Sequence, residues 1–592
     1  MLSRFFFRVA VAAVLVVSLV ALRFFFTGSH KLLYTDTYPL ETGERLQQYI
    51  PPRPYPPPLR PDSSSDPWNQ RAQRVRNAFV YAWQGYSKYA AGRDELTPID
   101  GGSVNNFNGW GVTLFDALDT LWLMGLHDEF RQSLHFVAKT NFTLDKDKYA
   151  PFFETTIRYL GGLLSAYALS GEPVLLSRAD DLGRMLLPAF NTTSGLPRYA
   201  VNTVTGQIKD GWNPHVLYAE ALSNQLEYKY LAHLTGRSEY FAKTESIMQL
   251  MYKAETTNGL YATMWNMQSG IPANKHFSVG AYADSAYEYL LKQYLLTARS
   301  EPQGLELYLN SVNGIIDNLL YITPVRNLLY VTDTNSGVPT HKLEHLSCFL
   351  PGLLALGILS LPTSPTTGSS SFTKKERQLH IWAAQGLAET CWIMYHDSKS
   401  GLAPDEVRML DFENWSENKF ARDITAEEVN EGLWVNQIGK WEKAGKPGGT
   451  PPGVPSLGQN VERKEDPTQR EYQPIKDSYL LRPETIESFF YMWKLTKDPK
   501  WRERGWSIFE AIEKHSKTDY GYASLSTADS DKPVLENEMP SYFMAETLKY
   551  LYLLFREDDI VSLEDWVFNT EAHPFPIFDW SPWEKQEYNI TV

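Results

Sequence analysis

The 592-residue sequence contains only two cysteines, Cys348 and Cys391. Two thiols are too few for a disulfide-stapled scaffold or for a zinc site with four thiolate ligands. In an oxidising compartment the natural interpretation is one disulfide, and a pair of buried free thiols is the alternative. The sequence also lacks an excess of positive charge, since its formal net charge is −14. Nucleic acid is therefore excluded as a partner, because no basic stripe is available to neutralise phosphates.

Three common catalytic signatures are missing from the sequence as well. It has no Gly-rich phosphate loop, no serine nucleophile elbow and no His-Glu zinc helix. The chain is instead rich in apolar residues, at 43%, and in aromatic residues, at 14%. Most aromatic side chains belong in a core, but clefts that bind sugars also use them as apolar platforms.

The N-terminus predicts a membrane-anchored protein whose remainder is lumenal. Residues 5–26 read FFFRVAVAAVLVVSLVALRFFF, and the Phe triplets extend the central apolar run towards the length of a membrane span. No clear small-residue cleavage site follows, so we favour an uncleaved anchor over a cleaved signal peptide. Residues 1–4 are then a cytosolic tail, in a single-pass type II protein of the ER or Golgi membrane. Four Asn-x-Ser/Thr sequons fit lumenal glycosylation, at Asn141, Asn191, Asn414 and Asn589.

A proline-rich stem and one large domain follow the anchor. The stem, residues 27–67, contains PPRPYPPPLRP, which is predicted to be an extended, stiff spacer. No second linker of this kind follows, so residues 68–592 are predicted to form one catalytic domain. Residues 440–473 are rich in Gly, Pro and charge, and they are predicted to be an exposed insertion loop, either simply solvated or a lid facing the substrate.

The domain is predicted to be all-α. Apolar residues recur at three- and four-residue spacing, and strict strand-like alternation is rare. A helix-hairpin theme recurs in which an acidic residue opens an apolar helix, and this indicates a closed ring of paired helices. The acids would then converge on one end of the ring, although helix N-termini favour acidic residues in any case. The helix-opening acids are Glu154, Glu220, Asp284, Glu487 and Glu546.

These carboxylates provide the groups that hydrolysis of a glycosidic bond requires. One carboxylic acid protonates the leaving oxygen, and one carboxylate activates water or attacks the sugar. Glu154 and Arg158 lie four residues apart, while Arg482, Glu484 and Glu487 surround a proline suited to a first helical turn. By spacing alone such groups also fit surface ion pairs. Here, however, they interrupt strongly apolar stretches, where buried charges need partners or a function.

At these motifs the sequence resembles the class I α-mannosidases, glycoside hydrolase family 47. The resemblance runs from about Ala78 to Pro574. It implies an (α/α)7 barrel and an inverting, calcium-dependent exo-α1,2-mannosidase that acts on high-mannose N-glycans of glycoproteins. The motifs that carry it, in the family's order, are YAWQGYSKYAAGRDEL, TLFDALDTLWLMGL, FFETTIRYLGGLLSAYALSG, ADSAYEYLLKQY, HLSCF, LRPETIES, AETLKYLYLLF and VFNTEAHPF.

The resemblance also implies roles for individual residues. Glu154 matches the general acid, Asp284 is a second candidate acting through water, and Glu484 matches the base. Thr570 of the last motif matches a Ca²⁺ ligand that supplies hydroxyl and carbonyl oxygens, and waters fit the remaining positions of such an ion. These waters are expected to be held by Glu220, Glu487, Glu546 and Glu571.

The remaining matches concern the surroundings of these groups. Arg158, Arg482 and His345 match the cationic and donor groups around the substrate, with a satisfied core histidine as the alternative for His345. Cys348 and Cys391 match the family's disulfide pair.

Two positions depart from the family pattern. Tyr282 stands where ER-type members have an arginine, and this favours broader, Golgi-like trimming over removal of a single mannose. Tyr542 replaces the usual phenylalanine that stacks on the sugar, and a phenol ring stacks equally well. Two alternatives to the hydrolase remain: a lectin-like glycan-binding protein of quality control, and a hydrolase of altered mannosidic linkage. Intact Glu154, Asp284 and Glu484 favour an active α1,2-mannosidase.

Overall fold

The computed structural model describes residues 66–364, 371–412, 430–456 and 461–590. The predicted cytosolic tail, the predicted membrane anchor, stem residues 27–65 and the sequon at Asn414 lie outside these ranges. Within them, no helix combines the length and the apolar character needed to cross a membrane.

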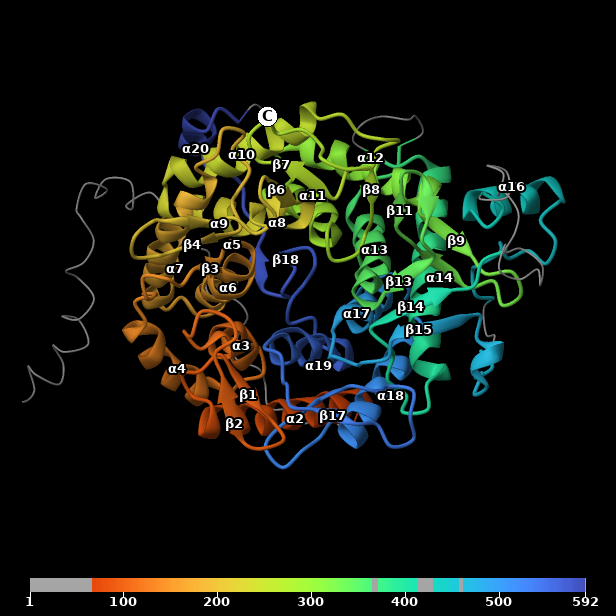
Figure 1. Ribbon diagram of the computed structural model, residues 1–592, viewed down its shortest axis with the longest axis horizontal. Helices are drawn as coiled ribbons and strands as arrows, with labels where there is room; N and C mark the ends of the chain where they lie inside the picture. The colour runs from red at the N-terminus through yellow and green to blue at the C-terminus, as the bar shows by residue number, and fades with distance from the viewer. Residues whose placement is uncertain (1–65, 365–370, 413–429, 457–460, 591–592) are drawn as a thin grey trace, which may run out of the picture. The chain divides into compact units, whose positions relative to one another are not determined.

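Helices dominate the described residues and surround a central hairpin of two strands, as Figure 1 shows. The fold is thus mostly helical, as the sequence predicts. The longer helices are α2 (Pro67–Tyr89), α3 (Val112–Leu123), α4 (His127–Lys139), α6 (Gly161–Ser170), α7 (Pro173–Leu186), α9 (Gln225–Thr235), α10 (Ser238–Lys253), α11 (Asp284–Leu296), α12 (Pro302–Asn318), α13 (Leu350–Ser360), α14 (Lys374–Asp397), α16 (Trp434–Lys443), α17 (Glu484–Thr496), α18 (Lys500–His515) and α19 (Leu548–Phe555). The shorter segments are α5 (Phe152–Glu154), α8 (Tyr218–Leu222), α20 (Pro582–Glu587), the π-helical η2 (Thr155–Leu160) and η6 (Phe543–Thr547), and the 3₁₀ turns η3 (Leu187–Phe190), η4 (His345–Phe349) and η5 (Pro467–Gln469).

The helices form two classes by burial. Helices α6, α11 and α13 are buried on nearly all sides, as expected of helices enclosed by others. Helices α4, α7 and α18 bury one face only, because their polar residues follow the opposite face. The first helix, α2, packs against α19 near the end of the chain, so sequence-distant segments meet and close the ring of helices.

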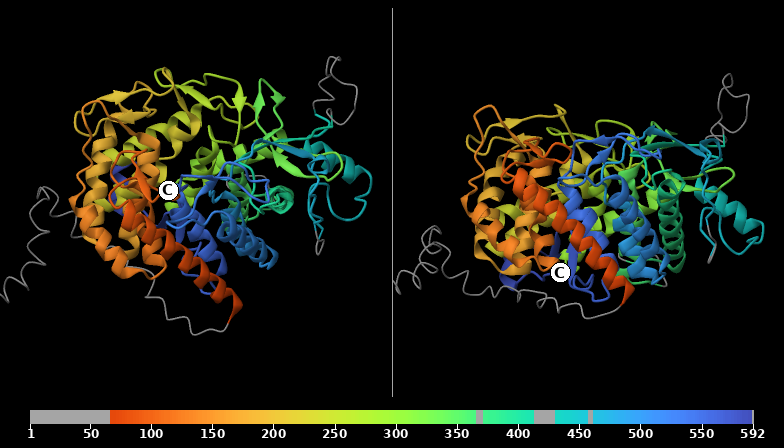
Figure 2. Two further views of the ribbon diagram at one scale, coloured as in Figure 1. Left: turned by 60° about the horizontal axis from the view of Figure 1, so that its bottom comes forward. Right: turned by 90° about the horizontal axis from the view of Figure 1, so that it is seen from below.

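The strands are short, and every ladder is antiparallel. Most of them lie at one end of the helices (Figure 2). The two-stranded sheets pair β1 (Glu95–Thr97) with β2 (Gly102–Val104), β6 (His215–Leu217) with β7 (Met264–Asn266), β9 (Leu320–Ile322) with β10 (Leu329–Val331), β16 (Ser524–Leu525) with β17 (Leu535–Glu536), and β18 (Trp566–Phe568) with β19 (Pro574–Pro576). The three-stranded sheets are β3 (Ala150–Pro151), β4 (Ala200–Val201) and β5 (Ile208–Lys209); β8 (His276–Phe277), β11 (Thr334–Asn335) and β12 (Val338–Pro339); and β13 (Lys342–Glu344), β14 (Glu406–Met409) and β15 (Tyr472–Lys476).

The segment 440–473, which is predicted to be an exposed loop, has regular secondary structure at both of its ends. It begins inside α16 and ends in β15, which pairs with β14. Two tryptophans explain the order at its start: the indole N–H of Trp434 donates to the carbonyl of Pro452 at 2.8 Å, and that of Trp441 donates to Pro447 at 3.0 Å. Most of the described residues in this segment are exposed, and its identity as an insertion loop stays a prediction.

Candidate active site

The predicted catalytic carboxyl groups lie at or near the starts of helical segments. Asp284 is the first residue of α11, and Glu484 is the first residue of α17. Glu154 ends α5 and leads into η2, while Glu220 lies in α8. Burial raises the pKa of Glu220 to about 7, and the charge of Glu154 adds to this shift. Burial likewise raises the pKa of Glu546, to which the charges of Glu571 and Glu484 add. The structure thus gathers carboxyl groups from segments far apart in the sequence.

Glu484 is surrounded by donors that favour its ionised form. His345 Nδ1 lies 3.2 Å from Glu484 Oε2, and Arg482 Nη1 lies 3.6 Å from Oε1. Arg482 is itself held by Asp405, whose Oδ1 accepts from Nε at 2.5 Å. Burial alone would raise the pKa of Glu484, but the hydrogen bond from His345 and the charge of Arg482 together lower it below the usual value. The Glu484 carboxylate is therefore suited to accept a proton from water.

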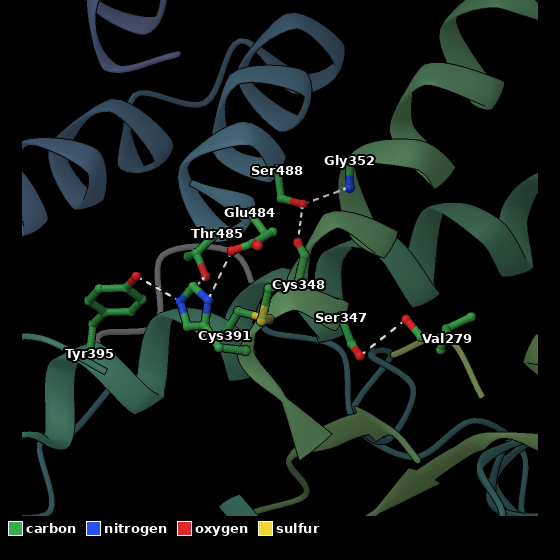
Figure 3. Close-up of a disulfide and its surroundings, with 10 residues drawn as sticks. Val279, Ser347, Cys348, Gly352, Cys391, Tyr395, Glu484, Thr485 and Ser488 are labelled. Atoms are coloured by element: carbon green, nitrogen blue, oxygen red, sulfur yellow. Dashed lines mark hydrogen bonds and ion pairs between the residues drawn. A yellow bond between two sulfur atoms is a disulfide. The ribbon is translucent and has the colours of Figure 1, made fainter. Parts of the chain in front are cut away.

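A buried tyrosine fixes the orientation of His345 (Figure 3). Tyr395 Oη lies 2.7 Å from His345 Nε2. A neutral imidazole that accepts from this hydroxyl at Nε2 carries its proton on Nδ1 and donates it towards Glu484. The side chain of His345 is buried, and these contacts make it part of the site rather than a core histidine alone.

The predicted disulfide joins Cys348 and Cys391 in the structure. Cys348 follows His345 by three residues in η4, and Cys391 precedes Tyr395 by one helical turn of α14. The bond therefore ties η4, which carries His345, to α14, which carries the Tyr395 hydroxyl that contacts this histidine (Figure 3).

Asp284 has a different environment. Its Oδ1 accepts from the backbone N–H of Ser285 at 2.6 Å and from the Ser285 hydroxyl at 3.1 Å. Among the described residues, no lysine or arginine forms an ion pair with it. Burial raises the pKa of Asp284 to about 7, opposed by the two bonds from Ser285 and supported by the charges of Glu288 and Glu344. A carboxyl group of this kind retains a proton close to neutral pH and can donate it.

Glu154 belongs to a network centred on Arg158. The guanidinium Nε donates to Glu154 Oε2 at 2.8 Å. Nη1 forms a short ion pair with Glu571 and lies 3.5 Å from Asp116 Oδ2. The Glu154 side chain is 35% exposed, so one end of this otherwise buried network is open to solvent. Glu154 is thus placed to contact a substrate while remaining paired with a cation.

Thr570, the residue expected to ligate a calcium ion, lies in the central hairpin. Thr570 lies in the turn between β18 and β19, and its backbone N–H donates to Tyr289 Oη at 3.4 Å. Asn569 shapes this turn, since its Oδ1 accepts from the backbone N–H groups of Glu571 at 2.9 Å and of His573 at 2.8 Å.

The charges around this turn fit a divalent cation. Burial raises the pKa of Glu487 to about 8, and burial together with neighbouring carboxylates raises the pKa values of Glu546 and Glu571 well above the usual range. One carboxyl oxygen of Glu220 and one of Glu227 are buried without a hydrogen-bond partner. No cluster of three or more His, Cys, Asp or Glu side chains in the described ranges is arranged to hold a metal directly. Buried carboxyl oxygens without hydrogen-bond partners are donors of the kind that an oxygen-preferring ion such as Ca²⁺ accepts.

The two departures from the family pattern occupy different surroundings. Tyr282 is exposed, with its ring centroid 6.5 Å from that of Trp212 in an edge-to-face arrangement. The Tyr542 hydroxyl donates to the carbonyl of Leu480 at 2.7 Å, and the Arg158 guanidinium lies 5.8 Å from the centroid of its ring. The extra hydroxyl is thus satisfied by the protein.

Beneath the hairpin, the structure contains a charged cluster that sequence reasoning missed. His573 Nδ1 lies 2.8 Å from Asp119 Oδ2, and its Nε2 lies 3.2 Å from Asp116 Oδ1. Lys549 Nζ lies 2.9 Å from Asp119 and also donates to the carbonyl of Ala572. The three-residue spacing of Asp116 and Asp119 within the apolar TLFDALDTLWL stretch was the available signal, because two buried acids on one helix face need partners.

The predicted sequon asparagines Asn141, Asn191 and Asn589 are exposed on the described part of the chain. Glycosylation at these positions stays a prediction.

Comparison with known proteins extends these observations. Residues 78–577 match the model of glycosyl hydrolase family 47. The chain is 35% identical over 529 residues to the human mannosyl-oligosaccharide 1,2-alpha-mannosidase IC, covering 88% of this chain and 73% of that protein. It is 36% identical over 540 residues to the human endoplasmic reticulum mannosyl-oligosaccharide 1,2-alpha-mannosidase, covering 90% and 67%. Among solved structures, the alpha-1,2-mannosidase from Trichoderma reesei superimposes with a TM-score of 0.71 at 27% identity, covering 86% of this chain and 99% of that one.

Proposed function

The chain belongs to glycosyl hydrolase family 47, and from this premise we propose that it removes terminal α1,2-linked mannose from high-mannose N-glycans with inversion at the anomeric carbon. Its enzyme class is that of the mannosyl-oligosaccharide 1,2-α-mannosidases, the name shared by the two human relatives. The paired helices are proposed to form the (α/α)7 barrel expected from the sequence.

The observation that carries the mechanism is the different surroundings of two carboxyl groups, Glu484 beside His345 and Arg482 and Asp284 beside Ser285. Glu484 has a lowered pKa, while burial raises the pKa of Asp284 to about 7. In the proposed reaction Glu484 takes a proton from water as the water oxygen bonds to the anomeric carbon. The glycosidic bond breaks on the opposite face of the sugar, and its oxygen takes the proton of Asp284. Such a pair of acid and base is what an inverting glycosidase requires.

Glu154 has a supporting role in this mechanism. Its Oε2 accepts from the Arg158 guanidinium at 2.8 Å, so this carboxylate is already engaged with a cation. Because Glu154 is partly exposed, it is proposed to accept hydrogen bonds from hydroxyl groups of the sugar beyond the scissile bond.

Calcium is part of this proposal. Thr570 would supply its hydroxyl and carbonyl oxygens, and Glu220, Glu487, Glu546 and Glu571 would hold the waters that complete the shell. A bound calcium ion supplies positive charge for orienting sugar hydroxyls and polarising water. The raised pKa values of the surrounding carboxyl groups support this assignment, since a divalent cation offsets their mutual repulsion.

The site also bears on the range of products and the location of the enzyme. Tyr282 leaves the rim without the positive charge that would fix one branch, so we propose trimming of several α1,2-linked mannoses. Two relatives, from rat and human, are named as endoplasmic reticulum enzymes, and this supports a place in the secretory pathway. We propose that residues 5–26 anchor the chain in the ER or Golgi membrane, with the enzyme in the lumen.

Product analysis tests the proposed function. The soluble part, from about residue 65 onward, is incubated with a high-mannose glycan in calcium and in chelator, and released mannose is followed with time. We expect successive losses of mannose in calcium, abolished by chelator and by Glu484→Gln. Glycan binding without release of mannose would instead identify a lectin-like protein.

A further inference from the structure

A pocket lies beside the segment that carries Glu154. It has a volume of about 260 Å³ and opens over the sheet formed by β3, β4 and β5, close to the smallest ligand pockets of about 300 Å³. Its lining combines aromatic rings with polar and charged side chains, among them Phe107, Asn108, Asp147, Tyr149, Tyr199 and Lys209.

The pocket is connected to the proposed catalytic network through its walls. Strand β3 runs directly into α5, which ends at Glu154. Asn108 Nδ2 donates to Thr155 Oγ1 at 3.0 Å, and the Phe107 ring centroid lies 5.4 Å from the Arg158 guanidinium. Burial raises the pKa of Tyr199, and so do the charges of Glu220 and Glu154. A ligand in this pocket would thus contact β3, the strand that runs into the helical segment ending at Glu154.

The aromatic lining continues along the rim towards Asp284. A β-carbon at Gly211 would lie 2.8 Å from Tyr199 Cγ, so this ring packs directly on the backbone there. The next residue, Trp212, is 42% exposed and meets Tyr282, which is 44% exposed. Tyr282 precedes Asp284 by two residues. Aromatic rings therefore lead from the pocket, through Tyr199 and Trp212, to Tyr282 beside Asp284.

The lining fits a neutral, hydroxyl-rich ligand. Tyr149 and Tyr199 offer apolar faces and phenolic hydroxyl groups, as platforms for sugar rings do. The Lys209 ammonium lies 6.0 Å from the Tyr149 ring centroid, and Asp147 adds a negative charge to the same lining. Because both signs of charge are present, the pocket does not select an anion or a cation.

We propose that this pocket is a carbohydrate subsite that holds a mannose residue from a second branch of the same N-glycan while the first branch is cleaved. The subsite rests on the proposed mannosidase function. Its physical effect is that binding energy from a non-reacting part of the substrate holds the glycan at the carboxyl groups. A small α1,2-linked disaccharide has no second branch to place in the pocket, so it serves as the reference substrate.

Kinetics on the two substrates test the subsite. We expect Tyr149→Ala to lower the ratio of kcat/KM for a branched high-mannose glycan to kcat/KM for α1,2-mannobiose about tenfold, mainly through KM, since it removes one stacked ring. Lys209→Ala, at an exposed position, is expected to lower the ratio about threefold and does not endanger folding. Tyr252→Ala removes a 40% exposed tyrosine of α10 outside the pocket and is the matched control. An unchanged ratio, or equal losses on both substrates, would overturn the subsite.

Binding separates this result from the fate of the proposed function. The affinity of Glu484→Gln for the branched glycan is measured by calorimetry with and without Tyr149→Ala. About tenfold weaker binding supports the subsite even if the wild type releases no mannose, whereas unchanged binding overturns it even if hydrolysis is confirmed. Weaker activity of Tyr149→Ala on a folded glycoprotein only, with the free glycan unaffected, would assign the pocket to polypeptide and also overturn the carbohydrate subsite.

Discussion

The surroundings of Glu484 and those of Asp284 are built in opposite ways. Glu484 lies beside His345 and Arg482, and these two are held in turn by Tyr395 and Asp405. In the part of the chain that the structure describes, the Asp284 carboxyl accepts two hydrogen bonds from its neighbour Ser285, and it otherwise faces burial and negative charge. One side thus stabilises a carboxylate and the other stabilises a carboxylic acid. The comparison teaches that two similar side chains acquire different roles from their partners, and not from their own chemistry.

The largest expected effect comes from removing the charge on the Glu484 side. Glu484→Gln keeps the shape of the side chain but cannot take a proton from water, so we expect kcat on a high-mannose glycan to fall about 10⁴-fold. Glu510→Gln, on the exposed face of α18, is the matched control and should retain full activity. Retention of more than a tenth of the activity by Glu484→Gln would remove this residue from the role of base.

The disulfide between Cys348 and Cys391 should stabilise the folded state near Glu484. Replacing both Cys348 and Cys391 with alanine opens a loop of 43 residues, and we expect the free energy of unfolding to fall by about 4 kcal/mol. Urea denaturation in the presence of calcium measures this change. A loss below about 1 kcal/mol would show that packing alone holds η4 to α14.

A smaller change should come from the hydroxyl that orients His345. Tyr395→Phe removes the shorter of two hydroxyl contacts to His345 Nε2 and leaves that of Thr485 at 3.2 Å. The hydrogen bond from His345 to Glu484 should therefore weaken, the pKa of Glu484 should rise, and activity at acidic pH should fall about threefold. The acid limb of the kcat/KM profile measures this shift. Tyr308→Phe removes a buried hydroxyl on α12, 3.4 Å from the carbonyl of Leu353, and should leave the limb in place. A uniform loss at every pH would indicate a purely structural role for Tyr395.

The smallest effect is expected on the Asp284 side. Ser285→Ala removes the hydroxyl that donates to Asp284 at 3.1 Å, while the backbone N–H remains. Because this bond favours the ionised form, its loss should raise the pKa of Asp284 by about half a unit and move the basic limb of activity to higher pH. A shift to lower pH would contradict the described environment of Asp284.

The sequence predicted the helical fold class and the disulfide pair, because apolar periodicity and two isolated cysteines leave few other interpretations. It also singled out Glu154, Asp284 and Glu484, since charged residues in apolar helices need partners. Their different surroundings could not be predicted. Tyr395 and Asp405 lie far from Glu484 in the sequence, and no local pattern indicates that they support its partners.

Two other features were beyond the sequence for a similar reason. The order within residues 440–456 depends on indole hydrogen bonds from Trp434 and Trp441, which composition cannot reveal. The pocket beside Glu154 is assembled from Phe107, Tyr149 and Tyr199. The pairing of β3 with β4 brings Tyr149 and Tyr199 together, and the hydrogen bond from Asn108 to Thr155 holds the segment of Phe107.

The pH dependence of kcat/KM tests the division between the two carboxyl groups most directly. At fixed calcium, the wild type is predicted to lose activity as pH rises through about 7, because Asp284 loses its proton there. Asp284→Asn should lose about 10²-fold in activity and show no such limb, whereas Glu154→Gln should keep it. A wild-type profile that stays flat above pH 7, or a limb that survives in Asp284→Asn and disappears in Glu154→Gln, would contradict the account and assign the acid to Glu154.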